Sequence, residues 1–175
     1  MSARADQVWP HVDPDEFREA LGQFATGVTV VTAGGDMAHG MTANAFASVS
    51  LDPPMVLVCV KNSARLNECV AHTGCFGVSI LAEEQQAAAC HFANSSRPEG
   101  DEQFDRFDCH EGPLTSAPLV GGALAWLECE VVEIFPGGDH HIYLGRVLTC
   151  STRPSSSPLT FYAGEFTSID RSRAS

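Results

Sequence analysis

Four polar side chains recur at even spacing within residues 40–50, and they are the first candidates for binding chemistry. Thr42, Asn44, Ser48 and Ser50 would share one side of a β-strand, because successive side chains in a strand point to opposite faces. Their hydroxyl and amide groups could line a site for a polar cofactor. The same pattern is typical of the solvent-facing side of an antiparallel sheet, which is its commoner cause. On this segment alone both interpretations stay open.

Two cations and a hydroxyl group follow the next expected strand. Residues 61–65 read Lys-Asn-Ser-Ala-Arg and lead into an expected helix over 64–73, with Ser63 as its N-cap. The N-terminus of a helix carries unpaired N–H groups and partial positive charge, which both favour an anion. We therefore expect Lys61, Ser63 and Arg65 to hold a phosphate group, and this favours the cofactor interpretation of the preceding strand.

The spacing of cysteine and histidine residues predicts no metal site. The seven cysteines contain no C-x-x-C pair, and the side chains within Cys90-His91 and Cys109-His110 would point to different sides of one element. Signature loops for dinucleotides, nucleoside triphosphates, zinc proteases and serine hydrolases are absent from the sequence as well. An odd number of cysteines and a start without an apolar leader are typical of reduced thiols, so we expect a cytoplasmic protein.

Hydrophobic periodicity predicts few helices and many strands. Helices are expected over 13–24, 64–73 and 83–92, and strands over 28–32, 41–50, 55–60, 76–81, 123–135, 142–150 and 159–161. Asp13 is the expected N-cap of the first helix and Pro14 its first residue, with Phe17, Leu21 and Phe24 on one face. The strands cluster instead of alternating with helices, which argues against a parallel sheet. The predicted fold is mainly β with peripheral helices, arranged as an antiparallel barrel.

Length and charge limit the architecture and the partners. A chain of 175 residues, 44% of them hydrophobic, suffices for one compact domain. We expect this domain over 13–170, between an N-terminal extension (1–12) and a C-terminal tail (171–175). The 22 acidic and 10 basic residues give a formal net charge of −12, which disfavours nucleic acid and anionic membranes as partners.

Four stretches of the chain together resemble one known family. They are Phe17-Arg18, residues 27–32, residues 42–54 and residues 138–147. In order and spacing they are similar to the flavin reductase family with the FMN-binding split barrel, and the resemblance spans about 15–169. It implies an antiparallel Greek-key split β-barrel that forms a homodimer. It also implies an NAD(P)H:flavin oxidoreductase, with FMN or FAD as the flavin and NADH or NADPH as co-substrate, which supplies reduced flavin to a separate flavin-dependent monooxygenase.

The resemblance further implies roles for individual residues. His140 follows Gly138-Asp139 in a turn that similar reductases use beside the nicotinamide, and it is the expected catalytic residue. The expected flavin-binding residues are Thr42, Asn44, Ala45, Ser48, Val49, Ser50, Lys61, Ser63, Arg65 and Asp139. Hydride transfer between nicotinamide and flavin is cofactor chemistry, so the protein has to orient the two rings and needs no strong acid or base.

Two other functions share the expected barrel. One is a flavin-dependent oxidase of the pyridoxamine-phosphate-oxidase type, which would act directly on a small substrate, and the other is a non-enzymatic flavin-binding protein. At this point the choices between FMN and FAD and between NADH and NADPH stay open. So does the question of whether the flavin is tightly bound or a substrate. For the homodimer, the apolar strand 56–60 is the expected interface.

Overall fold

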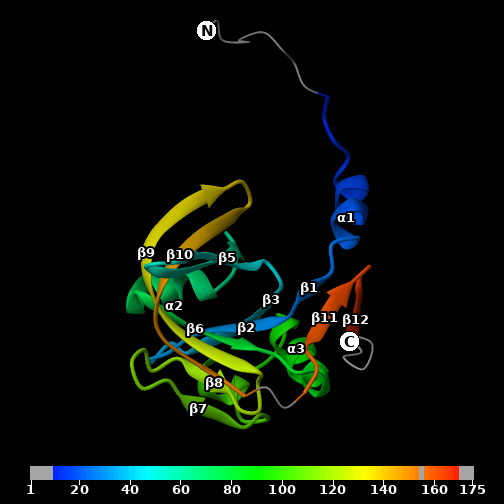
Figure 1. The fold of residues 1–175 in the computed structure, drawn as a ribbon. Helices are drawn as coiled ribbons and strands as arrows, with labels where there is room; N and C mark the ends of the chain where they lie inside the picture. Colours follow the sequence, from blue (N-terminus) through cyan, green and yellow to red (C-terminus); the bar gives the residue numbers. More distant parts are fainter. Residues whose placement is uncertain (1–9, 154–155, 170–175) are drawn as a thin grey trace, which may run out of the picture.

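The computed structural model describes residues 10–153 and 156–169. The expected C-terminal tail (171–175) and residues 1–9 of the expected N-terminal extension lie outside these ranges. Figure 1 shows strands forming the body of the molecule, with helices at its periphery. Among the described residues, no helix is both long and apolar enough to span a membrane.

The described residues form helices that lie between groups of strands. The helices are α1 (Pro14–Gly22), α2 (Leu66–Thr73) and α3 (Gln86–Ala93), with short 3-10 helices η1 (Glu83–Gln85) and η2 (Gly100–Gln103). The strands are β1 (Thr26–Gly27), β2 (Thr29–Ala33), β3 (His39–Ala43), β4 (Phe46–Leu51), β5 (Pro54–Lys61), β6 (Cys75–Ile80), β7 (Cys109–Glu111), β8 (Pro118–Val120), β9 (Ala125–Gly137), β10 (His140–Thr152), β11 (Leu159–Tyr162) and β12 (Glu165–Ser168). Asp13 caps α1 as expected, since its carboxylate accepts hydrogen bonds from the backbone N–H groups of Asp15 and Glu16.

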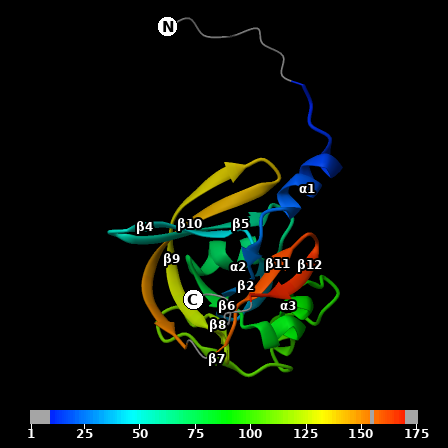
Figure 2. The ribbon, with the colours of Figure 1, turned by 45° about the vertical axis from the view of Figure 1, so that its right-hand side comes forward.

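Every paired strand in the described residues runs antiparallel to its neighbour. The main sheet has seven strands in the order β3-β2-β6-β9-β10-β5-β4, and smaller sheets have the orders β1-β11-β12 and β7-β8. The long hairpin of β9 and β10 contains two register shifts and curves around α2 (Figures 1 and 2). A sheet that curves in this way can wrap a core without closing into a complete barrel. The expected fold class, mainly β with peripheral helices and antiparallel pairing, is confirmed.

Two apolar clusters hold the fold together. In the first, α2 packs Leu66, Cys69 and Val70 against buried side chains of the main sheet, including Phe76 and Tyr143. In the second, α3 packs against apolar side chains of β2, β8 and β11. Its largest members are Phe92, Phe104 and Leu81. The two helices α2 and α3 are thus held to the sheets by separate apolar clusters.

The strand expected over 41–50 is two strands. β3 ends at Ala43 and pairs with β2, whereas β4 begins at Phe46 and pairs with β5. Asn44 and Ala45 form the break between them. The expectation of one continuous polar face on this segment was therefore wrong, because the chain leaves one edge of the main sheet at Asn44 and enters the opposite edge.

One further expectation was wrong in detail. Ser63 does not cap α2: the helix starts at Leu66 with Arg65 at its N-cap and no side-chain cap. Residues 61–64 instead form a turn, in which the Ala64 backbone N–H donates to the Lys61 carbonyl at 2.9 Å. On the expected interface strand 56–60, Val56, Val58 and Val60 are buried within the protomer, whereas Leu57 and Cys59 on its other face are half-buried, so an interface on this strand stays a prediction.

Candidate functional site

A cavity of about 620 Å³, here called the central cleft, lies where β3 and β5 end beside the β9–β10 turn. The turn before α2 and the segment after α3 complete it. Its lining residues are His39, Met41, Thr42, Ala43, Asn44, Ala45, Cys59, Lys61, Ser63, Ala64, Arg65, Phe92, Ala93, Ser95, Arg97, Pro98, Glu99 and His140. The volume falls within the range of sites that bury a small ligand or cofactor.

Most of the expected site residues line the central cleft. They are Thr42, Asn44, Ala45, Lys61, Ser63, Arg65 and His140. Ser48, Val49 and Ser50 are not among the described residues that line it, because β4 lies beyond the Asn44-Ala45 break and runs along β5. The structure thus brings together the start of the expected polar segment and the cations, but not the end of that segment.

The β9–β10 turn places an oriented imidazole on the cleft wall. His140 Nδ1 lies 2.7 Å from the Asp139 carboxylate, and this hydrogen bond and the imidazole charge lower the pKa of Asp139 below its usual range. Asp139 itself is not among the residues that line the cleft as the structure describes it. The turn is fixed to β5, since Asn62 donates its backbone N–H to the Asp139 carbonyl at 2.9 Å and its side-chain amide to the Gly138 carbonyl at 3.1 Å. Gly138 has a φ of +72°, which favours glycine at this position.

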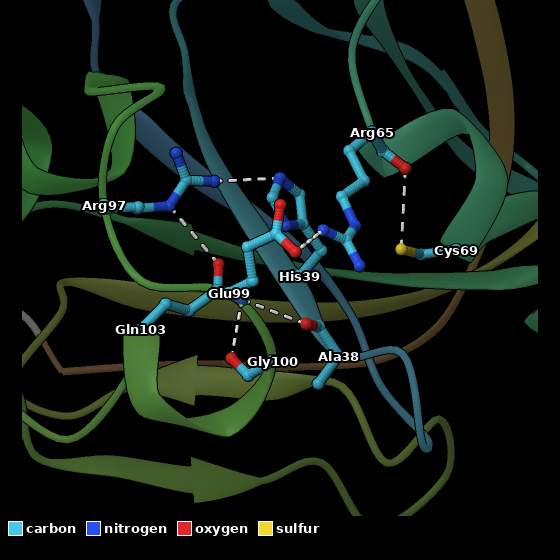
Figure 3. A network of polar contacts seen from close by, with 8 residues as sticks. All are labelled: Ala38, His39, Arg65, Cys69, Arg97, Glu99, Gly100 and Gln103. Atoms are coloured by element: carbon cyan, nitrogen blue, oxygen red, sulfur yellow. Dashed lines mark hydrogen bonds and ion pairs between the residues drawn. The ribbon is translucent and has the colours of Figure 1, made fainter.

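A turn between β5 and α2 supplies the cations of the cleft. The side-chain amide of Asn67 holds it by donating to the Lys61 carbonyl at 2.7 Å and to the Asn62 carbonyl at 3.2 Å. Arg65 Nη1 donates to the Glu99 carboxylate across the cleft (Figure 3). A carboxylate therefore already stands where Arg65 could bind a ligand anion, and a guanidinium can pair with the oxygens of a phosphate in the same way.

The wall formed by β3 and α3 combines polar and apolar groups. The Thr42 hydroxyl donates to the Ala89 carbonyl at 2.6 Å, which ties β3 to α3. Met41, Cys59 and Phe92 add apolar surface to the lining. An apolar wall beside polar strand ends suits a planar ring with polar edges, and the cations at the turn before α2 suit a phosphate attached to it.

A buried polar network supports the cleft from behind. The Gln103 side chain is fully buried and bridges three backbone groups: it accepts from the Gly40 N–H at 2.9 Å and donates to the carbonyls of Ala38 at 3.0 Å and Gly100 at 2.7 Å. Arg97 Nε donates to the same Gln103 oxygen at 3.3 Å (Figure 3). The network therefore fixes the segment after α3 to the start of β3.

His39 joins this network to the cleft. Its Nε2 lies 2.9 Å from Arg97 Nη2, which donates to it, since a guanidinium has no acceptor. Burial, followed by the charges of Arg97 and Arg65, lowers the pKa of His39 to about 4, with Glu99 opposing this shift. His39 is therefore neutral at pH 7 and carries its proton on Nδ1.

Sequence reasoning missed His39, Arg97 and Glu99 as lining residues. The one available signal is the Arg97-Pro98-Glu99 run, which places opposite charges around a proline in a polar stretch without periodicity. Nothing in the sequence indicates that Gln103 would be buried, because its three partners are backbone groups from two separate segments.

Comparison with known proteins identifies what this arrangement is similar to. The family model described as "Flavin reductase like domain" matches residues 21–170. The chain is 46% identical over 158 residues to an NADH-dependent FAD reductase of Streptomyces globisporus, covering 89% of this chain and 87% of that protein. It is 43% identical over 174 residues to an NADH-dependent flavin reductase of a Rhodococcus species, covering 97% of this chain and 94% of that protein.

Solved structures agree with these sequence matches. BorF, the flavin reductase component of a bacterial two-component tryptophan halogenase, superposes with a TM-score of 0.86 at 46% identity, covering 90% of this chain and 98% of BorF. The NADH:FAD oxidoreductase SgcE6 of Streptomyces globisporus, solved with NAD and FAD fragments, gives a TM-score of 0.87 at 42% identity, covering 94% and 99% of the two chains. The expected split-barrel architecture is confirmed by this likeness.

Proposed function

The chain belongs to the flavin reductase family, and from this premise we propose that it is an NADH-dependent flavin reductase that supplies reduced flavin to a separate monooxygenase. One observation supports this most. A single cleft is lined by two cations that suit a phosphate, Lys61 and Arg65, by a wall of polar and apolar groups, and by the oriented imidazole of His140. Relatives described as monooxygenase reductase components, such as HsaB of Rhodococcus jostii at 38% identity over 160 residues, support the partner.

The protein's part in this reaction is to bind and orient two cofactors. A bound flavin supplies the chemistry by accepting a hydride from the nicotinamide. Lys61, Ser63 and Arg65 hold its phosphate, while Thr42 and its neighbours at the end of β3 contact the ring edge. His140 positions the nicotinamide, and the Asp139 carboxylate keeps the imidazole in one orientation.

The remaining expected contacts belong to a longer ligand. Ser48, Val49 and Ser50 lie on β4 outside the central cleft, so they reach the flavin only where the bound molecule extends past the Asn44-Ala45 break. FAD is longer than FMN by an adenosine monophosphate unit and could extend in this way. The match to an NADH-dependent FAD reductase also favours FAD and NADH over FMN and NADPH.

We also assign a compartment and an assembly. All seven cysteines are free thiols, as a reducing cytoplasm would keep them. A homodimer is supported by apolar side chains that the protomer leaves exposed on α1 and just after it, among them Phe17 on the helix and Phe24 beyond its end.

Steady-state oxidation of NADH with added FAD, FMN or riboflavin tests the function. We expect one NADH consumed for each flavin reduced under anaerobic conditions, and negligible oxidation without added flavin. Binding of flavin without turnover would indicate a non-enzymatic flavin-binding protein. Turnover of a small substrate without free flavin would indicate an oxidase.

A further inference from the structure

The strongest unexplained contact in the central cleft is the ion pair between Arg65 and Glu99. Arg65 is the N-cap residue of α2, and Glu99 is the N-cap residue of η2. Their side chains meet across the cleft, where Arg65 Nη1 donates to Glu99 Oε2 (Figure 3). The hydrogen bond and charge of Arg65 lower the pKa of Glu99, so the carboxylate is ionised at neutral pH. In the free protein, the Arg65 guanidinium is therefore already paired with the Glu99 carboxylate.

Glu99 is presented by a backbone that is anchored on both sides. Two residues before it, Arg97 donates to the carbonyls of Asn94, at 2.8 Å, and of Gly40, and to Gln103. Four residues after it, Gln103 is fully buried and bonded to the start of β3 and to Gly100. The Glu99 side chain itself is 69% exposed. It can thus leave Arg65 for solvent by rotation, with the anchored backbone in place.

We propose that Glu99 is an internal competitor for the flavin phosphate: its carboxylate occupies Arg65 in the free protein and has to give way when the phosphate binds. This inference rests on the proposed function, because the competing anion is taken to be the flavin's own phosphate. Carboxylate and phosphate cannot both approach one guanidinium closely without repelling each other. Glu99 therefore weakens flavin binding and speeds flavin release, as a reductase that hands its flavin to another protein requires.

The size of the effect follows from the exposure of the pair. Ion pairs open to solvent are worth little, so breaking this one corresponds to a factor of roughly 3–5 in an equilibrium constant. Residual repulsion between the displaced carboxylate and a nearby phosphate raises this to about 5–10. The effect should be confined to flavins that carry phosphate.

The test compares E99Q with E102Q. Both changes remove one carboxylate, but Glu102 is exposed on η2 and does not line the central cleft as described. Flavin dissociation constants are measured by fluorescence quenching without nicotinamide. We expect E99Q to bind FMN about 5–10-fold more tightly and to release it more slowly, with riboflavin affinity changed less than twofold. E102Q should match the wild type for both flavins. In the Arg65→Ala background, adding E99Q should tighten FMN binding much less than it does in the wild type.

Several outcomes would overturn the proposal. Unchanged FMN affinity in E99Q would do so, and so would equal tightening of riboflavin, which has no phosphate. An equal gain in E102Q would mean that only the general negative field matters. A lower KM for NADPH without tighter FMN binding would assign the anion to the nicotinamide. Failure of the proposed function looks different: FMN binds and E99Q tightens it, but the protein does not oxidise NADH. Absence of flavin binding in every variant would overturn both.

Discussion

At the scale of single residues, His39 shows how burial sets the charge of a site. Its imidazole lies between Arg97 and the Arg65–Glu99 pair and is kept neutral by burial and by the two arginines. A protonated His39 would add a third cation where Arg97 and Arg65 already stand. The neutral form instead accepts a hydrogen bond from Arg97, and this holds the guanidinium in its network.

The depressed pKa of His39 predicts a loss of stability in acid. The unfolded chain binds a proton at this residue near pH 6.5, whereas the folded chain binds it only near pH 4. Protons therefore favour the unfolded state within this window. The stabilisation is complete above about pH 6.5 and declines as the pH falls toward 4, by on the order of 2 kcal/mol after allowance for partial exposure.

Urea unfolding of the wild type and of His39→Gln at a series of pH values measures this term. Glutamine can still accept a hydrogen bond from Arg97 but does not titrate. We expect the difference in unfolding free energy between the two proteins to shrink as the pH falls from 7 toward 4. A difference that stays constant with pH would show that His39 does not titrate with a depressed pKa.

His140 predicts a second residue-scale effect, on the nicotinamide. His140→Ala should raise the KM for NADH or slow hydride transfer about tenfold, while the flavin dissociation constant changes less than twofold, because the cations proposed to hold the flavin phosphate lie on another segment. Asp139→Asn should act in the same direction but more weakly, since it removes only the charged partner of the imidazole. Stopped-flow reduction separates the two steps. Loss of flavin binding in His140→Ala would place this residue in the flavin site instead.

At the scale of elements, a buried carboxylate connects β9 to the loop before β8. Glu128 is 2% exposed, and its Oε2 accepts hydrogen bonds from the backbone N–H groups of Leu114 at 2.9 Å and Thr115 at 2.7 Å, and from the Thr115 hydroxyl at 2.7 Å. A Cβ at Gly112 would lie 2.5 Å from the same oxygen, so only glycine fits beside it. The loop is thus folded around the carboxylate.

Removal of this carboxylate predicts a large loss of stability. Glu128→Ala leaves two N–H groups and one hydroxyl without their acceptor in a buried place, which costs about 3 kcal/mol. Glu128→Gln keeps an acceptor oxygen and should cost about half as much. Urea unfolding gives both values, with Glu111→Ala as an exposed control on β7. A cost below about 1 kcal/mol for Glu128→Ala would mean that water replaces the carboxylate.

The elements also show which features the sequence can predict. The start of α1 was predicted correctly because its cap is local, with Asp13 accepting from residues two and three positions ahead. The break after β3 could not be predicted from the sequence, because it depends on tertiary contacts such as the hydrogen bond between the Thr42 hydroxyl and the Ala89 carbonyl. In the site, most expected residues meet in the central cleft, but the Arg65–Glu99 pair forms between segments that no local pattern connects.

At the scale of the whole molecule, α1 lies at the edge of the body, above β11 and β12 in the view of Figure 1. No residue of α1 is buried. Phe17 and Leu21 on the helix are each 56% exposed, and Phe24 just beyond it is 74% exposed. The end of α1 is joined to the β11–β12 turn through the Ala163 N–H, which donates to the Gly22 carbonyl at 2.9 Å. Apolar side chains exposed on an amphipathic helix favour contact with a partner surface, and a second copy of the chain can provide one.

The expected homodimer is therefore predicted to depend on α1. Light scattering should give about twice the chain mass of 18.7 kDa for the wild type. The double change Phe17→Ser and Leu21→Ser should shift the protein toward the monomer, because both side chains are exposed in the protomer and their apolar area is lost only from the interface. Glu19→Gln, exposed on the same helix, should leave the dimer intact. Since neither apolar side chain belongs to the protomer core, the monomer should keep its folded circular dichroism spectrum.

A wild-type monomer with full flavin turnover would contradict the dimer. A double variant that stays dimeric would place the interface on another apolar surface, such as the exposed tip of β9 around Ile134.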